Sequence, residues 1–268
     1  MLDSQIPSPP SPWQVGSVSF LNAKPLIHGL ENDPRVALHL EVPSKLLDGL
    51  RDRRFDVALL PVIDFQRLEG LRLIPVGGIG CDGPTLTVRI FSRSPLEQIE
   101  TLLCDTDSHT SVALARVILA ERYNRRPRFF DLSHELAQDI SLPRLLIGDK
   151  VITDEPADCP HQIDLGQAWK ELTGLPFVFA TWMGRSDADL GELPQILATA
   201  RVKGLASVEQ IVAQYAPIHR WPLPIARQYL ASYLKFEIGP EQLKAIRLFH
   251  QLAAKHGVVA HDPWLLRT

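Results

Sequence analysis

Three short polar turns contain the residues of this sequence that are best suited to bind a small molecule. In the first turn, Ser19 and Asn22 stand between a strand pattern and Pro25, which suits a first helical turn because proline has no N–H to leave unpaired. Ligands of open α/β sheets bind where a strand ends and a helix begins, and helix N-terminal amides favour anions. Asn22 is therefore either a ligand-binding amide or only the cap of its helix, and the spacing leaves both open.

The second turn follows a glycine-rich stretch. Residues 77–83 contain four glycines, a composition that predicts backbone lying close to a ligand. The stretch is not a mononucleotide fingerprint, because a predicted strand at 86–92 follows it where a helix would be needed. Thr85 and Thr87 come next, and their hydroxyls are candidate substrate ligands.

The third turn precedes a predicted helix at 112–123. Its residues Ser108, His109, Thr110 and Ser111 would combine hydroxyls with the free amides of the helix N-terminus. Such a group can hold a carboxylate. In the alternative, Ser108 or Thr110 is only an N-cap, and a lone cap is commoner than a ligand site.

Composition restricts the class of protein. The 268 residues are 45% apolar and 22% charged, with a net charge of −3, which gives no electrostatic reason to expect nucleic acid as a partner. The three cysteines are dispersed, which is typical of a reduced protein. No apolar run approaches the roughly 18 residues that span a bilayer. We expect a cytoplasmic protein without membrane partners, as a monomer or weak homodimer, with a disordered lead-in at 1–12.

The sequence lacks the motifs of most cofactor-dependent enzymes. It contains no HExxH, no GxSxG, no Walker loop and no GxGxxG before a helix. The histidines are scattered, and no CxxC pair indicates a metal site. The sequence therefore predicts no metal and no cofactor.

Apolar periodicity predicts alternating strands and helices, followed by a helical tail. The strands are expected at 15–21, 37–42, 55–60, 71–76, 86–92, 102–105, 128–132, 145–148 and 176–183, and the helices at 25–32, 43–53, 112–123, 164–174, 190–203, 205–215, 222–235 and 240–256. Short connections between the first strands and helices predict parallel pairing.

The same pattern predicts an α/β fold of two lobes. Lobe 1 would comprise 13–93 and 180–268, including the helical tail, and lobe 2 would be inserted at 94–179. Two strands, 86–92 and 177–183, would cross between the lobes as a hinge. Because clefts between domains are preferred ligand sites, the residues alone indicate a two-lobed protein that binds a small anion.

Six segments together resemble the chorismate dehydratase family, which opens the futalosine route to menaquinone. The similarity extends from residue 15 to about residue 182, and the last segment is the most specific. The segments are 16–26 (GSVSFLNAKPL), 55–61 (FDVALLP), 80–84 (GCDGP), 106–111 (TDSHTS), 146–149 (LIGD) and 164–178 (DLGQAWKELTGLPFV).

The resemblance implies the two-lobed fold of type II periplasmic solute-binding proteins. It also implies a hydro-lyase that removes water from chorismate to give 3-[(1-carboxyvinyl)oxy]benzoate without a cofactor. Asn22 matches the family's active-site asparagine, and Thr85 or Thr87 stands where the family usually has a serine. The Ser108 turn would hold a carboxylate, whereas Asp149 would be structural. No matched motif offers a general base, so the substrate's own enolpyruvyl carboxylate is one hypothesis.

Other functions remain as alternatives at this point. The related 1,4-dihydroxy-6-naphthoate synthase shares the fold, but segment 164–178 favours the dehydratase. A non-catalytic small-anion-binding protein would normally carry a signal peptide, and none is found in the sequence. A ligand-sensing regulator is disfavoured because the sequence has no helix-turn-helix motif or basic face.

Overall fold

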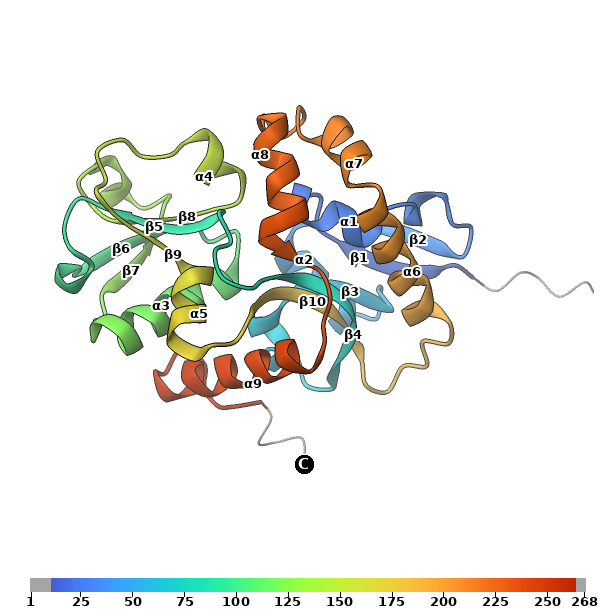
Figure 1. The fold of residues 1–268 in the computed structure, drawn as a ribbon. Coiled ribbons are helices and arrows are strands. Elements are labelled where there is room, and N and C mark those ends of the chain that lie inside the picture. The colour runs from blue at the N-terminus through green and yellow to red at the C-terminus, as the bar shows by residue number, and fades with distance from the viewer. Residues whose placement is uncertain (1–10, 264–268) are drawn as a thin grey trace, which may run out of the picture.

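The computed structural model describes residues 11–263, which form two β-sheets with helices around them (Figure 1). The first sheet has six strands in the order β11-β4-β10-β3-β1-β2: β1 (Trp13–Ser17), β2 (Val36–Leu40), β3 (Val57–Pro61), β4 (Leu71–Cys81), β10 (Phe177–Arg185) and β11 (Leu234–Lys235). The second has five strands in the order β7-β6-β8-β5-β9: β5 (Val88–Ser92), β6 (Thr101–Cys104), β7 (Arg128–Asp131), β8 (Arg144–Ile147) and β9 (His161–Asp164). The whole second sheet is thus inserted in sequence between β4 and β10. Most of the expected lead-in at 1–12 lies outside the described residues.

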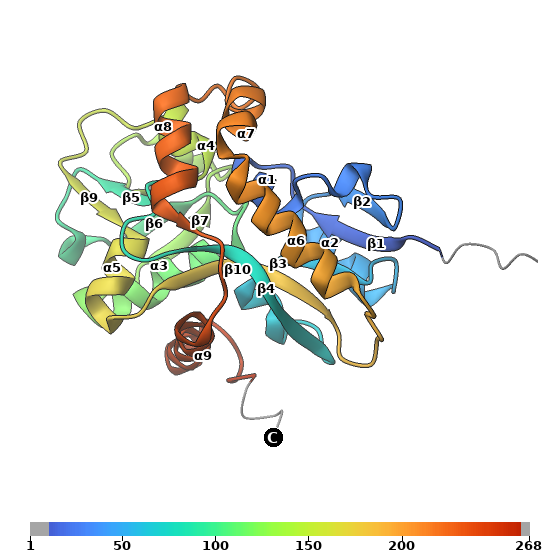
Figure 2. The same cartoon turned by 45° about the vertical axis from the view of Figure 1, so that its right-hand side comes forward.

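Helices surround both sheets and form most of the described chain after β10. They are α1 (Lys24–Ile27), α2 (Pro43–Arg51), α3 (His109–Tyr123), α4 (Asp149–Thr153), α5 (Leu165–Thr173), α6 (Leu193–Ala206), α7 (Val208–Tyr215), α8 (Leu223–Gln228) and α9 (Pro240–Lys255). A π-helical turn, Tyr229–Tyr233, continues α8. Figure 1 shows α8 between the second sheet and the pair α1 and α6, and in Figure 2 the same helix overlaps the second sheet.

The predicted parallel pairing of the first strands is confirmed. Strand β1 pairs in parallel with β2 and with β3. Helix α2 connects β2 to β3 and buries Leu46 and Leu50 in the core of the first sheet. These leucines share one helix face, which is why the apolar pattern predicted the element correctly.

The predicted helix at 25–32 is wrong in length. Helix α1 ends at Ile27, and Gly29 adopts a left-handed conformation with φ of 81° before a short 3₁₀ helix at 30–32. A glycine reaches this conformation without the steric cost that a Cβ would bring. Leu26, Ile27 and Leu30 are nevertheless buried, as the pattern predicted.

Two glycines of the glycine-rich stretch serve the packing of two strands, a role that our expectation of a nearby ligand did not include. Gly77, Gly78 and Gly80 lie within β4, which runs to Cys81. A Cβ on Gly78 would lie 2.6 Å from the carbonyl oxygen of Ala180, and one on Gly80 would lie 2.5 Å from that of Phe177. The glycines therefore permit close approach of β10, whose register against β4 shifts twice along this stretch.

The predicted hinge strands do not cross between the sheets. Strand β5 pairs with β8 and β9 inside the second sheet, and β10 pairs with β3 and β4 inside the first. The chain passes between the sheets through the loop at 82–87, which precedes β5, and through the segment between β9 and β10. The lobe boundaries at residues 93 and 180 stay predictions.

The helical tail divides between the two cores. Helix α6 packs on α1 and β4, beside the first sheet. Helix α9 instead contacts α3 and β10, and its Ile246 and Phe249 share a core with Leu114 and Ile118 of α3. Figure 2 shows α9 below β10, apart from α6 and α7. Helix α9 therefore contacts both strand β10 of the first sheet and helix α3, and the assignment of the whole tail to lobe 1 stays a prediction.

Gly204 offers a test of how tightly α6 packs on α1. A Cβ on Gly204 would collide with the carbonyl oxygen of Pro25. We expect Gly204→Ala to lower the free energy of unfolding by about 2 kcal/mol, because overpacking outweighs the gain of about 1 kcal/mol in helix propensity. Urea unfolding measures the change. Val202→Ala, at an exposed position of the same helix, should stay within about 0.5 kcal/mol of the wild type. A stabilised Gly204→Ala protein would contradict the close contact.

Candidate active site

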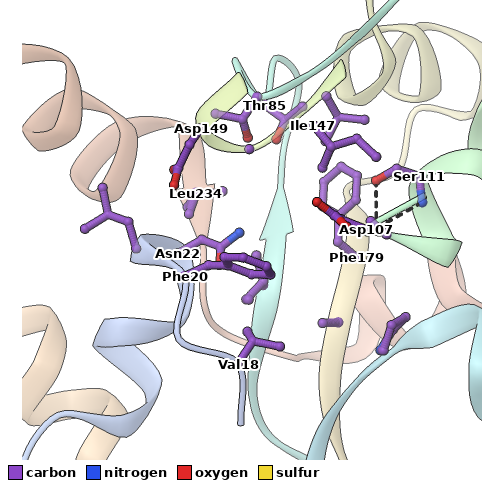
Figure 3. Close-up of a pocket in the computed structure, with 18 of the residues that line it drawn as sticks. Val18, Phe20, Asn22, Thr85, Asp107, Ser111, Ile147, Asp149, Phe179 and Leu234 are labelled. Carbon is purple, nitrogen blue, oxygen red and sulfur yellow. Dashed lines mark hydrogen bonds between the residues drawn. The ribbon is translucent and has the colours of Figure 1, made fainter. Parts of the chain in front are cut away.

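A cavity of about 250 Å³ lies between the two sheets. Figure 3 shows Phe20 and Asn22 on one side of it, Asp107, Ser111 and Phe179 on another, and Thr85 and Asp149 nearby. The lining combines apolar walls with a few polar groups, as is usual for small-molecule sites. The other lining residues used below are Thr87, Ser108, Ile147, Lys150, Trp221 and Tyr229.

Asn22 does not act as a helix cap. Strand β1 ends at Ser17, and a 3₁₀ helix at Leu21–Ala23 turns the Asn22 side chain into the cavity (Figure 3). Neither this helix nor α1 is capped by a side-chain hydrogen bond. The Oδ1 atom of Asn22 is buried and has no hydrogen-bond partner among the described residues. A buried acceptor of this kind is costly unless another group completes it, which favours the ligand-binding interpretation.

Tyr229 completes a polar network that the sequence did not predict. Its hydroxyl lies 2.9 Å from Thr87 Oγ1, and the side chain of Asn22 is a second hydrogen-bonding neighbour. Burial raises the pKa of Tyr229 to about 12, although these hydrogen bonds oppose the shift. The phenol is neutral at physiological pH, and its hydroxyl can donate or accept a hydrogen bond. No local sequence signal could have joined Tyr229 to Asn22, since 206 residues separate them.

The start of α3 brings two of the predicted residues into the cavity. Ser108 is the N-cap, and its Oγ accepts hydrogen bonds from the backbone N of Ser111 at 3.3 Å and from Ser111 Oγ at 3.0 Å. Both serines also line the cavity. The cap and the ligand-binding interpretation are thus compatible, because the capped helix end itself faces the site.

Three predicted site residues do not line this cavity. Ser19 is exposed. Thr110 is fully buried, and its Oγ1 accepts a hydrogen bond from the backbone N of Ile63 at 3.3 Å. The Nδ1 atom of His109 lies 3.1 Å from Asp64 Oδ2. The first turn of a helix points successive side chains in different directions, so the four-residue motif could not act as one ligand set.

Lys150 is the one Lys, Arg or His among the described residues that line the cavity. Its Nζ lies 2.8 Å from Asp105 Oδ2 and 3.0 Å from Asp107 Oδ2. Burial disfavours the charged amine, but the hydrogen bonds and charges of the two carboxylates prevail and raise the pKa of Lys150. Lys150 directly follows the LIGD segment at 146–149, but no pattern in the sequence predicted that this lysine would line a site.

Asp149 links the second sheet to the C-terminal helices. Its Oδ2 lies 2.8 Å from His219 Nδ1, and its Oδ1 accepts a hydrogen bond from Trp221 Nε1 at 2.7 Å. Asp149 begins α4, whereas both partners lie between α7 and α8. Since Asp149 and Trp221 also line the cavity, these bonds connect its two sides.

The described part of the chain has neither a metal-ligand cluster nor a membrane-spanning helix. Residues 11–263 contain no group of three or more His, Cys, Asp or Glu side chains arranged to hold a metal ion. Within the same residues, no helix has the length and apolar character of a membrane span.

The fold is that of periplasmic solute-binding proteins. The periplasmic aliphatic sulphonate binding protein SsuA from Escherichia coli superimposes with a TM-score of 0.65 over 95% of this chain and 90% of its own, at 13% sequence identity. Similarity at that level of identity establishes the fold alone.

Sequence comparison identifies the family. Residues 13–255 match the family model described as menaquinone biosynthesis, and the chain belongs to that family. The chorismate dehydratase of Thermus thermophilus is 29% identical over 223 residues, covering 75% of this chain and 80% of the relative. The chorismate dehydratase of Campylobacter jejuni is 27% identical over 241 residues, covering 87% and 94%.

The raised pKa of Tyr229 predicts a pH-dependent stability. An unfolded tyrosine ionises near pH 10, and the folded one at about 12, so the unfolded state loses its proton first and stability falls as pH rises from 10 to 12. The stability of Tyr229→Phe does not fall with pH for this reason, because phenylalanine does not ionise, but the variant also lacks the hydrogen bond to Thr87. At pH 8 we expect the variant to be less stable than the wild type by about 1 kcal/mol.

By pH 11 this difference should narrow or reverse, because ionisation then destabilises only the wild type at this position. Urea unfolding of both proteins at the two pH values measures the difference. A stability gap that stays constant from pH 8 to pH 11 would show that the phenol ionises equally in both states.

Proposed function

We propose that this protein is a chorismate dehydratase, a hydro-lyase that converts chorismate into 3-[(1-carboxyvinyl)oxy]benzoate and water. The observation that carries the proposal is the similarity, over most of both chains, to two relatives of that name within the same family. The cavity supports it independently, because it combines an unpartnered amide oxygen, neutral hydroxyls and one cation between apolar walls.

The reaction requires mainly that the substrate is held in the right orientation and that a delocalised anion is stabilised. The C3–H bond breaks, its electrons form a ring double bond, and the C4–O bond releases hydroxide, which takes up a proton to leave as water. Charge from C3 can spread through C1=C2 into the ring carboxylate, and the product ring is aromatic. Preorganised neutral donors are suited to stabilise such a delocalised anion.

Asn22, Tyr229 and Thr87 are the residues that fit this task. The buried Oδ1 of Asn22 can accept a hydrogen bond from the C4 hydroxyl, and its amide nitrogen can donate to charge that develops on the substrate. The Tyr229–Thr87 hydrogen bond of 2.9 Å holds that end of the network in place. Phe20 and Phe179 would cover the ring and keep water away, which strengthens these polar contacts.

The carboxylates of chorismate fit the opposite side of the cavity. The N-terminus of α3 at Ser108 and Ser111 favours an anion. Lys150 adds a full positive charge, and its partner Asp107 has a side chain that is 61% exposed and can move away from it. Among the described lining residues, the carboxylates are those of Asp107 and Asp149, and both already have donor partners. We propose the substrate's own enolpyruvyl carboxylate as the base, because Asp149 is held by His219 and Trp221, and Asp107 lies on the side of the cavity that would receive a substrate carboxylate.

Incubation of the purified protein with chorismate tests the proposal. We expect a product lighter than chorismate by one water, with the absorbance of a substituted benzoate. Mass spectrometry separates this outcome from spontaneous decay, since rearrangement leaves the mass unchanged and loss of pyruvate removes a larger fragment. Absence of the dehydrated product at high enzyme concentration would refute the proposed function.

Asn22→Ala tests the role of the unpartnered amide. If Asn22 stabilises charge that develops in the transition state, its loss costs about 2.7–4 kcal/mol, or roughly a hundredfold to a thousandfold in kcat. Saturating chorismate isolates this effect from substrate binding, and circular dichroism checks the fold. Asn32→Ala, at an exposed position outside the cavity, is the matched control and should retain wild-type turnover. Near-normal kcat in Asn22→Ala would exclude the catalytic role.

A further inference from the structure

The carboxylate of Asp164 connects the two functional parts of the chain. Its Oδ1 accepts hydrogen bonds from Gly166 N at 2.9 Å and Gln167 N at 3.1 Å, which caps α5. The same carboxylate accepts hydrogen bonds from Thr85 N at 3.0 Å and Leu86 N at 2.8 Å. One side chain therefore binds four backbone N–H groups, two of them in the loop at 82–87, which we call the crossing loop.

The crossing loop contains a strained residue. Leu86 has φ of 70°, in the left-handed region that residues with a Cβ rarely occupy. Its side chain packs against the core of the first sheet. Thr85 and Thr87, on either side of it, are buried and line the cavity. The unusual backbone thus packs the Leu86 side chain against the core, while Thr85 and Thr87 line the cavity and the Thr87 hydroxyl reaches Tyr229.

Gly166 allows α5 to reach the crossing loop. A Cβ on Gly166 would lie 2.6 Å from both Cys81 Sγ and the carbonyl oxygen of Gly83, and 3.2 Å from Thr85 Cβ. Only a glycine at this position lets the helix N-terminus approach closely enough for Asp164 to bind the loop. Both residues belong to segment 164–178, the most specific part of the sequence resemblance, to which the active site itself assigns no role.

We propose that Asp164 and Gly166 are positioning residues for the active site. The hydrogen bonds from Thr85 N and Leu86 N to Asp164, which we call the clamp, hold Leu86 in its left-handed conformation. This conformation places the Thr87 hydroxyl at Tyr229, and the Tyr229 hydroxyl in turn contacts Asn22. Without the clamp, Leu86 relaxes to negative φ and turns Thr85 and Thr87 away from the cavity. The inference rests on the proposed function for its catalytic consequence, whereas the clamp itself can be measured without any activity.

The first experiment compares steady-state kinetics of Asp164→Asn and Gly166→Ala with those of the wild type. We expect kcat to fall about a hundredfold, as for other displacements of about 1 Å in an active site, with a much smaller change in KM. Gly239→Ala is the matched control, because its Cβ would meet only the flexible end of Gln242 at 3.3 Å. Wild-type kcat in folded Asp164→Asn and Gly166→Ala would overturn the proposal.

The second experiment asks whether removing the strain restores activity. A glycine at position 86 adopts positive φ without steric cost, so Asp164→Asn combined with Leu86→Gly should recover about tenfold in kcat over Asp164→Asn alone. The combination with Leu86→Ala removes the same core contacts but keeps the Cβ, and should recover nothing. Equal activity of the two double variants would overturn the proposal, since a purely structural Asp164 would not distinguish them.

The third measurement is independent of catalysis. Amide hydrogen exchange at Thr85 and Leu86 should be slow in the wild type and faster in Asp164→Asn by at least about tenfold, because both amides lose a hydrogen bond to the carboxylate. Unchanged exchange would overturn the clamp. If the wild type fails to dehydrate chorismate while exchange responds as expected, the proposed function fails and the clamp stands.

Discussion

The structure depends on the pairing of β10 with both β3 and β4. These two strands are not neighbours, so the first sheet is continuous only because β10, which returns from the insertion, lies between them. The close approach requires Gly78 and Gly80 in β4, where a Cβ would strike carbonyl oxygens of β10. The same strand places Phe179 in the cavity. The position of β10 therefore makes the first sheet continuous, returns the chain from the inserted second sheet, and supplies one wall of the cavity.

Among the described residues that line the cavity, neutral hydroxyl and amide groups lie beside one cation, Lys150. Tyr229 is neutral and Lys150 is charged at physiological pH, and their surroundings reinforce both states: burial raises the pKa of Tyr229 to about 12, and two carboxylates raise the pKa of Lys150. We propose that such a site holds a dianion and stabilises charge that moves into its ring. The fold of periplasmic solute-binding proteins supplies the cavity, while Asn22 and its neighbours supply the chemistry that we propose.

The sequence predicted α2 and α5 well because each has an apolar face that is buried, and it predicted β3 because that strand is continuously apolar and buried along its whole length. It missed β9 and β11, which are four and two residues long and exist because a neighbouring strand pairs with them. Within the site, Asn22 was recognisable from its position after a strand. Ser108 and Ser111 could have been separated from their neighbours by helical spacing. Tyr229 could not be found, since only tertiary packing of the π-helical turn brings it to Asn22.

The measurement that tests this account most directly is a crystal structure with 3-[(1-carboxyvinyl)oxy]benzoate bound. The account predicts the product in the cavity between the sheets, with the Asn22 amide in hydrogen-bond contact near ring carbons 3 and 4. One carboxylate should lie at the N-terminus of α3, close to Lys150. Product bound outside this cavity, or inside it with the Asn22 amide directed away from the ring, would contradict the account.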